Sequence, residues 1–175
     1  GIRIKQGKLS LDTTAGELLV KWRAQGCEAI ANTTVRQMLR MSDGFNLDEW
    51  YYPGFDVTSM LFSNADGVDE LIRQMADSSH SSSGKRAGVP GSCFHYSSMT
   101  SNILAKMLAA TFPSHQEYLR FPSTALFEPL GMTSAALETD ARGNFLTSSF
   151  GWATARDWAK LGHLYLADGT LPANG

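Results

Sequence analysis

The sequence is poor in cysteine, in net charge and in long apolar runs. Its only cysteines are Cys27 and Cys93, which could form one disulfide or remain as thiols, and the sequence does not decide between these. Charged residues make up 18% and the formal net charge is −2, which argues against a nucleic-acid partner. No apolar run reaches the length of a membrane span, and no signal-peptide pattern opens the chain.

The composition is that of a globular protein. Hydrophobic residues make up 43% of the 175 residues, which is enough for a single domain over residues 1–175 with a buried core. The first stretch, "GIRIKQGKLSLD", has no initiator methionine, and the last, "LADGTLPANG", stops in turn-forming residues. We therefore expect both ends to be cut from a longer protein, and apolar faces left by missing parts could drive self-association.

Helical patterns dominate the chain, so the predicted fold is mainly α with a few short strands. Apolar spacings, capping boxes and glycine stops predict these helices: one around Glu17 to Ala24, one after Thr34 that ends at Ser42–Gly44, one from about Asp66, one after Ser98, one after Ser114 and one near Thr154. In the last helix, Trp158, Leu161 and Tyr165 are predicted to face inward. An aromatic loop, "FNLDEWYYPGFD", and a polar loop, "DSSHSSSGKRAG", separate the earlier helices.

The stretch "PGSCFHYSSMTSNILAKMLAATF" (90–112) places a tyrosine and several hydroxyls directly before an apolar helix. Tyr96 and Ser98 would share one face of an extended segment, with Ser97 turned away. If Ser98 is the N-cap, the positive end of the helix dipole favours a Tyr96 phenolate, which is suited to general base catalysis beside a cation. The alternative is a packing tyrosine before a serine that only caps the helix.

Five segments in one order resemble the serine β-lactamase and penicillin-binding-protein family. They are "GKLSLD", "TTVRQMLRMSDGF", "PGSCFHYSSMTSNILAKML", "LFEPLGM" and "GWATARDWAKLGHLYLADG". The third is similar to the family's P-G-x-x-F-x-Y-S-(N/S) segment, and the likeness is greatest to the branch of class C β-lactamases, carboxylesterases and 6-aminohexanoate-dimer hydrolases. The resemblance implies a helical subdomain of the β-lactamase/transpeptidase-like α+β fold.

The resemblance also implies roles for three residues. Tyr96 would be the catalytic acid/base, working with the lysine of an S-x-x-K motif to activate a serine. Ser98 would take the catalytic place that class C enzymes give to asparagine, and Tyr51 would line the substrate cleft. The implied substrate is a small-molecule ester or amide, and the family slightly favours a bacterial periplasmic or secreted location.

Two of the family's catalytic segments are missing from these residues. Its S-x-x-K motif would precede Gly1, and its K-T-G or H-x-G strand would follow Gly175. The literal match Ser82-Ser83-Gly84-Lys85 lies in the polar loop without an apolar stripe, so it is not expected to be a nucleophile. The chain alone is therefore expected to be inactive, and a non-catalytic helical binding or interaction module is the alternative.

No cofactor or metal site is predicted. Cys93 and His95 form a C-x-H pair, but zinc needs three or four ligands and no second pair has suitable spacing. The sequence also has no G-x-S-x-G elbow, no Walker loop and no glycine-rich dinucleotide turn.

Overall fold

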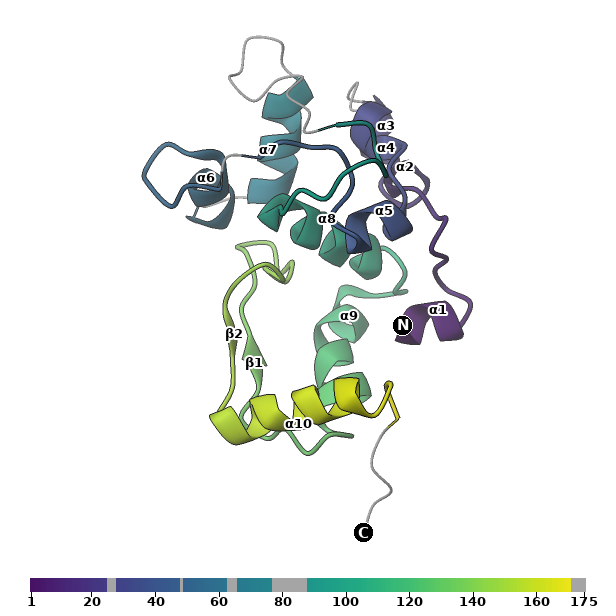
Figure 1. Cartoon of the computed structure of the whole chain (residues 1–175), viewed down its shortest axis with the longest axis vertical. Helices are drawn as coiled ribbons and strands as arrows, with labels where there is room; N and C mark the ends of the chain where they lie inside the picture. The colour runs from purple at the N-terminus through teal and green to yellow at the C-terminus, as the bar shows by residue number, and fades with distance from the viewer. Residues whose placement is uncertain (25–27, 48, 63–65, 77–87, 171–175) are drawn as a thin grey trace.

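A computed structural model describes residues 1–24, 28–47, 49–62, 66–76 and 88–170 (Figure 1). The described part is mainly helical, as predicted. In chain order its elements are α1 (Ile2–Lys5), α2 (Ala15–Leu18), α3 (Val20–Ala24), α4 (Glu28–Ala31), α5 (Val35–Leu39), α6 (Asp56–Phe62), α7 (Gly67–Ala76), α8 (Ser98–Ala109), α9 (His115–Pro122), the π-helix η1 (Ser123–Phe127), β1 (Ala136–Leu137), β2 (Gly151–Trp152) and α10 (Ala155–Leu166).

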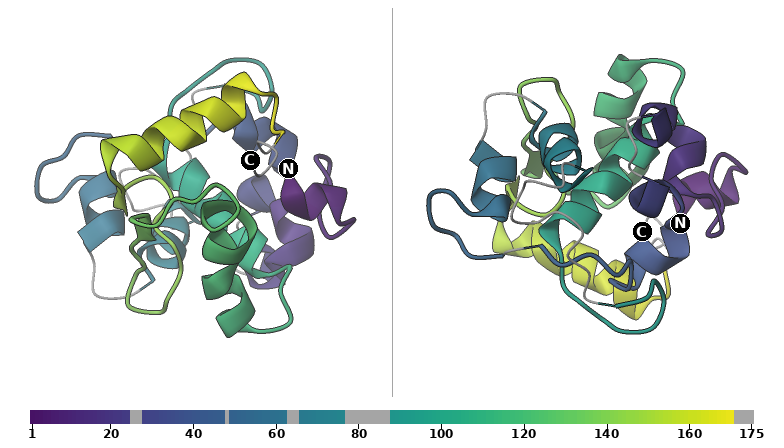
Figure 2. Two further views of the ribbon diagram at one scale, coloured as in Figure 1. Left: turned by 90° about the horizontal axis from the view of Figure 1, so that it is seen from below. Right: turned by 90° about the horizontal axis from the view of Figure 1, so that it is seen from above.

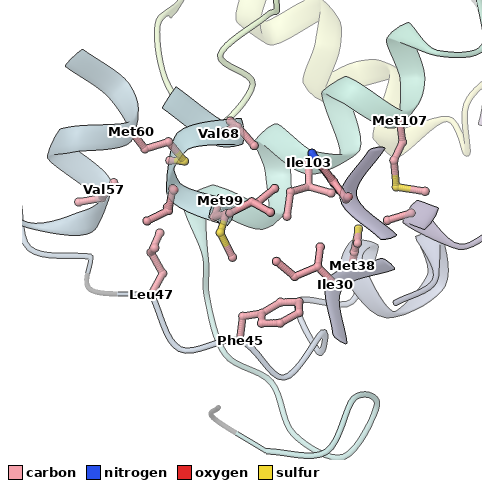
Figure 3. Packing of buried hydrophobic residues seen from close by; sticks show 14 of the residues in the cluster. Ile30, Met38, Phe45, Leu47, Val57, Met60, Val68, Met99, Ile103 and Met107 are labelled. Carbon is pink, nitrogen blue, oxygen red and sulfur yellow. The ribbon is translucent and has the colours of Figure 1, made fainter. Parts of the chain in front are cut away.

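Helix α8 lies at the centre of the core. It packs against α2, α5, α6, α7 and α9, and its Met99, Ile103 and Met107 side chains are fully buried. Figure 3 shows these side chains among apolar residues of the earlier helices, including Met38 of α5 and Met60 of α6. The buried side chains of α8 therefore join the helices of the described part around one core.

Side-chain caps explain where several of these helices begin. Thr34 caps α5 in the predicted capping box with Gln37, and Ser114 caps α9 by accepting from the Glu117 N–H at 3.2 Å. Thr154 caps α10 in the same way. Helix α5 ends at Leu39, earlier than predicted, and Gly44 follows it with φ +83°, a conformation that favours glycine.

The predicted boundaries differ from the structure in two further places. The expected helix over residues 17–24 is split into α2 and α3, because Leu19 leaves helical geometry with ψ 61°. The aromatic loop is irregular up to Phe55, but its last residue, Asp56, begins α6, a helix that the sequence reading did not predict.

A β-hairpin leads from η1 to α10. Strands β1 and β2 pair antiparallel with Ala136 opposite Trp152, and the loop between them returns to α8, where the Thr147 hydroxyl donates to the Ser101 carbonyl at 2.7 Å. Seen from below, α10 lies along one edge of the molecule (Figure 2).

The inward orientation predicted for α10 is wrong for two of its three residues. The Tyr165 side chain is 79% exposed and Trp158 is 48% exposed, while Leu161 is half-buried. Helical spacing identifies residues that share a face, but that face is buried only where another element covers it.

Some of the sequence predictions fall on residues outside the described part. Residues 77–87 of the polar loop, with the Ser82–Lys85 match, and Cys27 lie there, so neither the S-x-x-K match nor the disulfide is tested. Among the described helices, none has both the length and the apolar character needed to cross a membrane.

Candidate functional site

Two segments that are far apart in the sequence, residues 41–44 and 88–95, lie side by side next to the N-terminus of α8. The Gly91 N–H donates to the Ser42 carbonyl at 2.6 Å, and the His95 N–H donates to the Met41 carbonyl at 2.7 Å. A side chain at Gly44 would collide with the backbone of Gly88, so glycine is required where the turn after α5 passes the later segment. The residues that precede α8 are therefore fixed along the turn at 41–44.

The N-cap of α8 is Ser97, and the prediction that Ser98 holds this place is wrong. The Ser97 side chain accepts from the Thr100 N–H at 3.3 Å, and Ser97 is fully buried whereas Tyr96 is exposed, which agrees with a Ser97 side chain turned away from that of Tyr96. Ser97 has extended backbone angles, whereas Ser98 is already the first helical residue. The helix therefore begins one residue earlier than an N-cap at Ser98 would require, which leaves the Ser98 hydroxyl available for another partner.

That partner is Glu49, a residue that the sequence reading missed. Glu49 Oε1 accepts from the Ser98 N–H at 2.5 Å, and Oε2 accepts from the Ser98 hydroxyl at 2.7 Å. A carboxylate is favoured here, since the first turn of a helix presents unpaired N–H groups and the positive end of its dipole. The available signal was an acid within an aromatic loop, but nothing local indicates a partner 49 residues away.

Tyr96 projects its side chain outward from a fixed backbone. Its neighbours on either side are held by the bond from His95 to Met41 and by the Ser97 cap, yet its own side chain is 53% exposed. No hydrogen bond joins its hydroxyl to another residue in the described part of the chain. The phenol is thus accessible beside the N-terminus of α8.

Tyr51 lies in an aromatic loop that has its own internal structure. The Phe55 N–H donates to the Tyr52 carbonyl at 3.2 Å across Pro53 and Gly54, and Gly54 has φ +91°, as a type II turn requires. The Thr58 hydroxyl on α6 donates to the Trp50 carbonyl at 3.4 Å. The Tyr51 side chain is 58% exposed, and no ring contact with Tyr96 occurs among the described residues.

Polar side chains of α8 hold two more segments near this helix end. The Thr100 hydroxyl donates to Asp43, which also accepts from the Phe45 N–H at 2.9 Å. Farther along the helix, the Asn102 amide donates to the Ser148 hydroxyl at 3.0 Å and accepts from the Ser148 N–H at 3.2 Å. Residues in the first turns of α8 are therefore hydrogen-bonded to the turn after α5, to the aromatic loop and to the loop of the hairpin.

The described residues contain no cluster of three histidine, cysteine, aspartate or glutamate side chains that could hold a metal ion. Cys93 is exposed at the surface, and His95 is half-buried two residues later. The polar groups at this helix end are instead hydroxyls, one carboxylate and a phenol, which can donate, accept and transfer protons.

A family model described as Beta-lactamase matches residues 2–175. The chain belongs to the β-lactamase family. No curated protein matches the sequence. Similar solved structures include a "putative beta-lactamase from Bacteroides dorei DSM 17855", 19% identical with a TM-score of 0.67, which covers 95% of this chain and 45% of its own. Another is a "putative 6-aminohexanoate-dimer hydrolase from Bacillus anthracis", 18% identical with a TM-score of 0.71, covering 98% and 45%.

The β-lactamase-family chain spans about half the length of these two solved structures, and the likeness to them is one of fold. Within it, two of the three predicted site residues, Tyr96 and Ser98, lie at the same helix end. No direct contact between Tyr51 and Tyr96 occurs among the described residues. Tyr51 follows Glu49 by two residues, and Glu49 is hydrogen-bonded to Ser98, so Tyr51 is linked to this helix end through Glu49.

Proposed function

We propose that the protein is a serine hydrolase that cleaves ester or amide bonds through an acyl-enzyme, with Tyr96 as its general acid/base. One observation carries this proposal: the Tyr96 phenol is exposed beside the N-terminus of α8 while the backbone on both sides of it is held in place. Membership of the β-lactamase family supports the reaction class.

In the proposed reaction, the Tyr96 phenolate accepts the proton of a serine hydroxyl as the serine oxygen attacks the carbonyl carbon of the substrate. The protonated Tyr96 then donates this proton to the leaving oxygen or nitrogen as the ester or amide bond breaks. Water hydrolyses the acyl-serine by the same proton transfers in reverse. The serine and a partner lysine would come from an S-x-x-K segment outside residues 1–175, so the chain alone is proposed to be inactive.

Tyr51 is proposed to contact a small-molecule substrate, because its side chain is exposed in a loop that is tied to the start of α8. The Bacillus anthracis structure of similar fold carries the name of a "putative 6-aminohexanoate-dimer hydrolase", and two such amino acids are joined by an amide bond, which agrees with an ester or amide substrate. Ser98 is proposed to support the site through its buried hydroxyl, and no cofactor takes part.

The test is covalent labelling followed by intact-mass measurement. The 175-residue chain and the intact protein encoded by its gene are each exposed to a fluorophosphonate and, separately, to a reactive penicillin. We expect one stoichiometric fluorophosphonate adduct on the intact protein and none on the chain. Tyr96→Phe should slow labelling of the intact protein by about 100-fold or more, which is the usual contribution of general base catalysis.

The matched control is Tyr165→Phe, which removes the hydroxyl of an exposed tyrosine on α10 and should leave the labelling rate unchanged. An adduct on the 175-residue chain would mean that the nucleophile lies within residues 1–175. Absence of any adduct on the intact protein would favour the non-catalytic binding module.

A further inference from the structure

Both carboxylate oxygens of Glu49 are hydrogen-bonded to a single residue, Ser98. One of its oxygens accepts from the Ser98 N–H and the other from the Ser98 hydroxyl, at 2.5 and 2.7 Å. Ser98 is fully buried and Glu49 is half-buried, so water competes little for these bonds. Hydrogen bonds to a charged acceptor are stronger than neutral ones, and this pair also benefits from the helix N-terminus.

Each end of the Glu49–Ser98 link lies two residues from an exposed tyrosine along the sequence. Glu49 precedes Tyr51 by two residues, and Ser98 follows Tyr96 by two residues. Two residues of chain span at most about 7 Å, so each tyrosine backbone lies close to one end of the link. A displacement of Glu49 would therefore be passed to Tyr51, and a displacement of the first turn of α8 to Tyr96.

The segment that carries Tyr51 is held at its other end as well. Its turn at Tyr52–Phe55 is closed by a backbone hydrogen bond, and the Trp50 carbonyl accepts from Thr58 of α6. A segment with internal bonds moves as a unit, so the bond at Glu49 sets its position relative to α8.

We propose that Glu49 is a positioning residue that fixes the Trp50–Tyr52 segment relative to Tyr96, and that Ser98 donates the hydrogen bonds that hold its carboxylate. The consequence of this positioning for catalysis rests on the proposed function, in which Tyr51 contacts the substrate and Tyr96 is the acid/base. A buried serine whose hydroxyl donates to Glu49 acts through that residue and not on a substrate directly.

The test is ¹⁹F NMR of the 175-residue chain labelled with 3-fluorotyrosine. The chain has five tyrosines, and single Tyr→Phe variants assign their signals. In Glu49→Ala we expect the Tyr51 and Tyr96 signals to shift and broaden together, while those of Tyr118 and Tyr165 stay unchanged. The Ser98 amide should exchange with solvent at least about ten-fold faster, since a hydrogen bond to a charged group is lost.

Three variants give the test its specificity. Glu49→Gln keeps an acceptor oxygen for the Ser98 N–H, so the Tyr51 and Tyr96 signals should lie close to their positions in the unmodified chain. Ser98→Ala loses the hydroxyl bond but keeps the N–H bond, so its shifts should be smaller. Glu117→Ala, which removes a carboxylate bonded to Ser114 in the first turn of α9, is the matched control and should move neither signal.

Unchanged Tyr51 and Tyr96 signals in Glu49→Ala would overturn the proposal. Equal shifts of all five signals, with a lowered melting temperature, would also overturn it, since Glu49 would then serve general stability. These readouts need no enzymatic activity. A failure of the labelling experiment would therefore count against the proposed function and leave this inference to be judged by the NMR spectra alone.

Discussion

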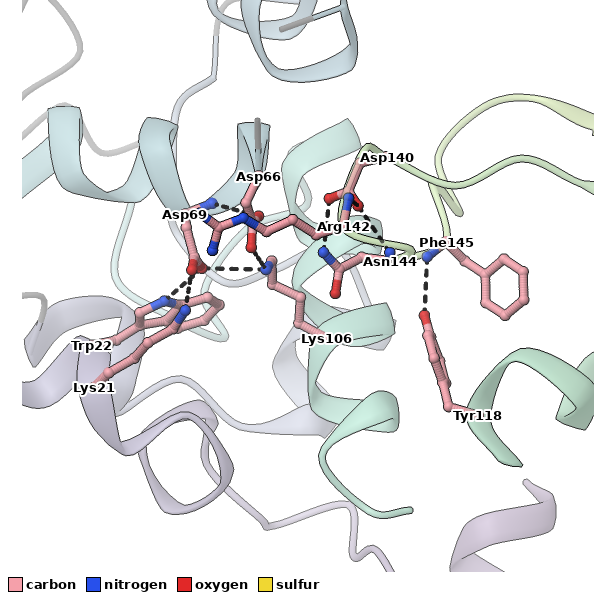
Figure 4. Close-up of polar contacts among 10 residues, drawn as sticks. All are labelled: Lys21, Trp22, Asp66, Asp69, Lys106, Tyr118, Asp140, Arg142, Asn144 and Phe145. Carbon is pink, nitrogen blue, oxygen red and sulfur yellow. Dashed lines mark hydrogen bonds and ion pairs between the residues drawn. The ribbon is translucent and has the colours of Figure 1, made fainter. Parts of the chain in front are cut away.

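At the scale of single residues, Tyr118 shows how burial changes the chemistry of a side chain. Its ring is buried on α9 beside Phe145, with ring centroids 5.0 Å apart, and its hydroxyl accepts from the Phe145 N–H at 3.1 Å (Figure 4). Burial raises the pKa of Tyr118 to about 12, although the hydrogen bond from Phe145 opposes the shift. Tyr118 therefore joins α9 to the hairpin as a neutral phenol.

Alkaline titration should reveal the raised pKa of Tyr118. Its pKa in the folded chain lies above the unfolded value of about 10, so its contribution to stability is complete below pH 10 and is lost as the pH rises towards 12. Absorbance at 295 nm should show one tyrosine ionising near pH 12, and Tyr118→Phe should remove this step. If Tyr165→Phe removed it instead, the assignment would be wrong.

At the scale of elements, α8 shows what the sequence could and could not reveal. Its apolar residues follow the predicted helical spacing, and of them Ile103 and Met107 are fully buried, whereas Leu104, Leu108 and Thr111 are only half-buried. The same helix carries a second stripe at i, i+4 and i+8, formed by Ser98, Asn102 and Lys106, whose side chains are buried and polar. This stripe was not recognised.

The partners of this polar stripe explain why it was missed. They are Glu49, Ser148 and Asp66, which lie 40 to 49 residues away along the chain. Periodicity and capping motifs depend on neighbouring residues, whereas these pairs exist only after the chain has folded. For the same reason Tyr96 could be proposed from the segment around it, but Glu49 could not.

Helix α10 is attached to the chain through a buried carboxylate. Asp157 accepts from Lys160 at 2.7 Å, and from the hydroxyl and the N–H of Ser134 at 2.7 and 2.8 Å. These hydrogen bonds, with that from Lys160 the largest, lower the pKa of Asp157 to about 2. The charged carboxylate thus joins the start of α10 to the segment before β1.

Acid should loosen this attachment in a defined pH range. Because the pKa of Asp157 is lowered on folding, its contribution is complete above about pH 4 and is lost as the pH falls towards 2. Measured relative to an unstructured peptide at the same pH, amide exchange of α10 should accelerate over this range in the unmodified chain. In Asp157→Asn this relative rate should already be high at pH 5 and should change less with pH. Asp12→Asn, at an exposed carboxylate, should behave like the unmodified chain.

At the scale of the whole molecule, a group of charges that is buried at Lys106 and Asp66 connects three helices. Lys106 of α8 is paired with Asp66, which precedes α7, and lies 3.3 Å from Asp69 of α7 (Figure 4). Asp69 also accepts from Lys21 and from the Trp22 indole of α3. Burial alone would raise the pKa of Asp69, but the bond from Lys21, the charge of Lys106 and the bond from Trp22 outweigh it and lower the pKa.

The two lysines of this network should differ strongly in their effect on stability. Lys106→Met keeps a side chain of similar shape but leaves the buried Asp66 carboxylate without its cation, so the free energy of unfolding should fall by about 3–5 kcal/mol. Lys21 is half exposed, and Lys21→Met should cost less than about 1 kcal/mol. Urea unfolding measures both, and Asp66→Asn in the Lys106→Met background should recover part of the loss. Equal costs for the two lysines would mean that the charges do not hold α7 and α8 together.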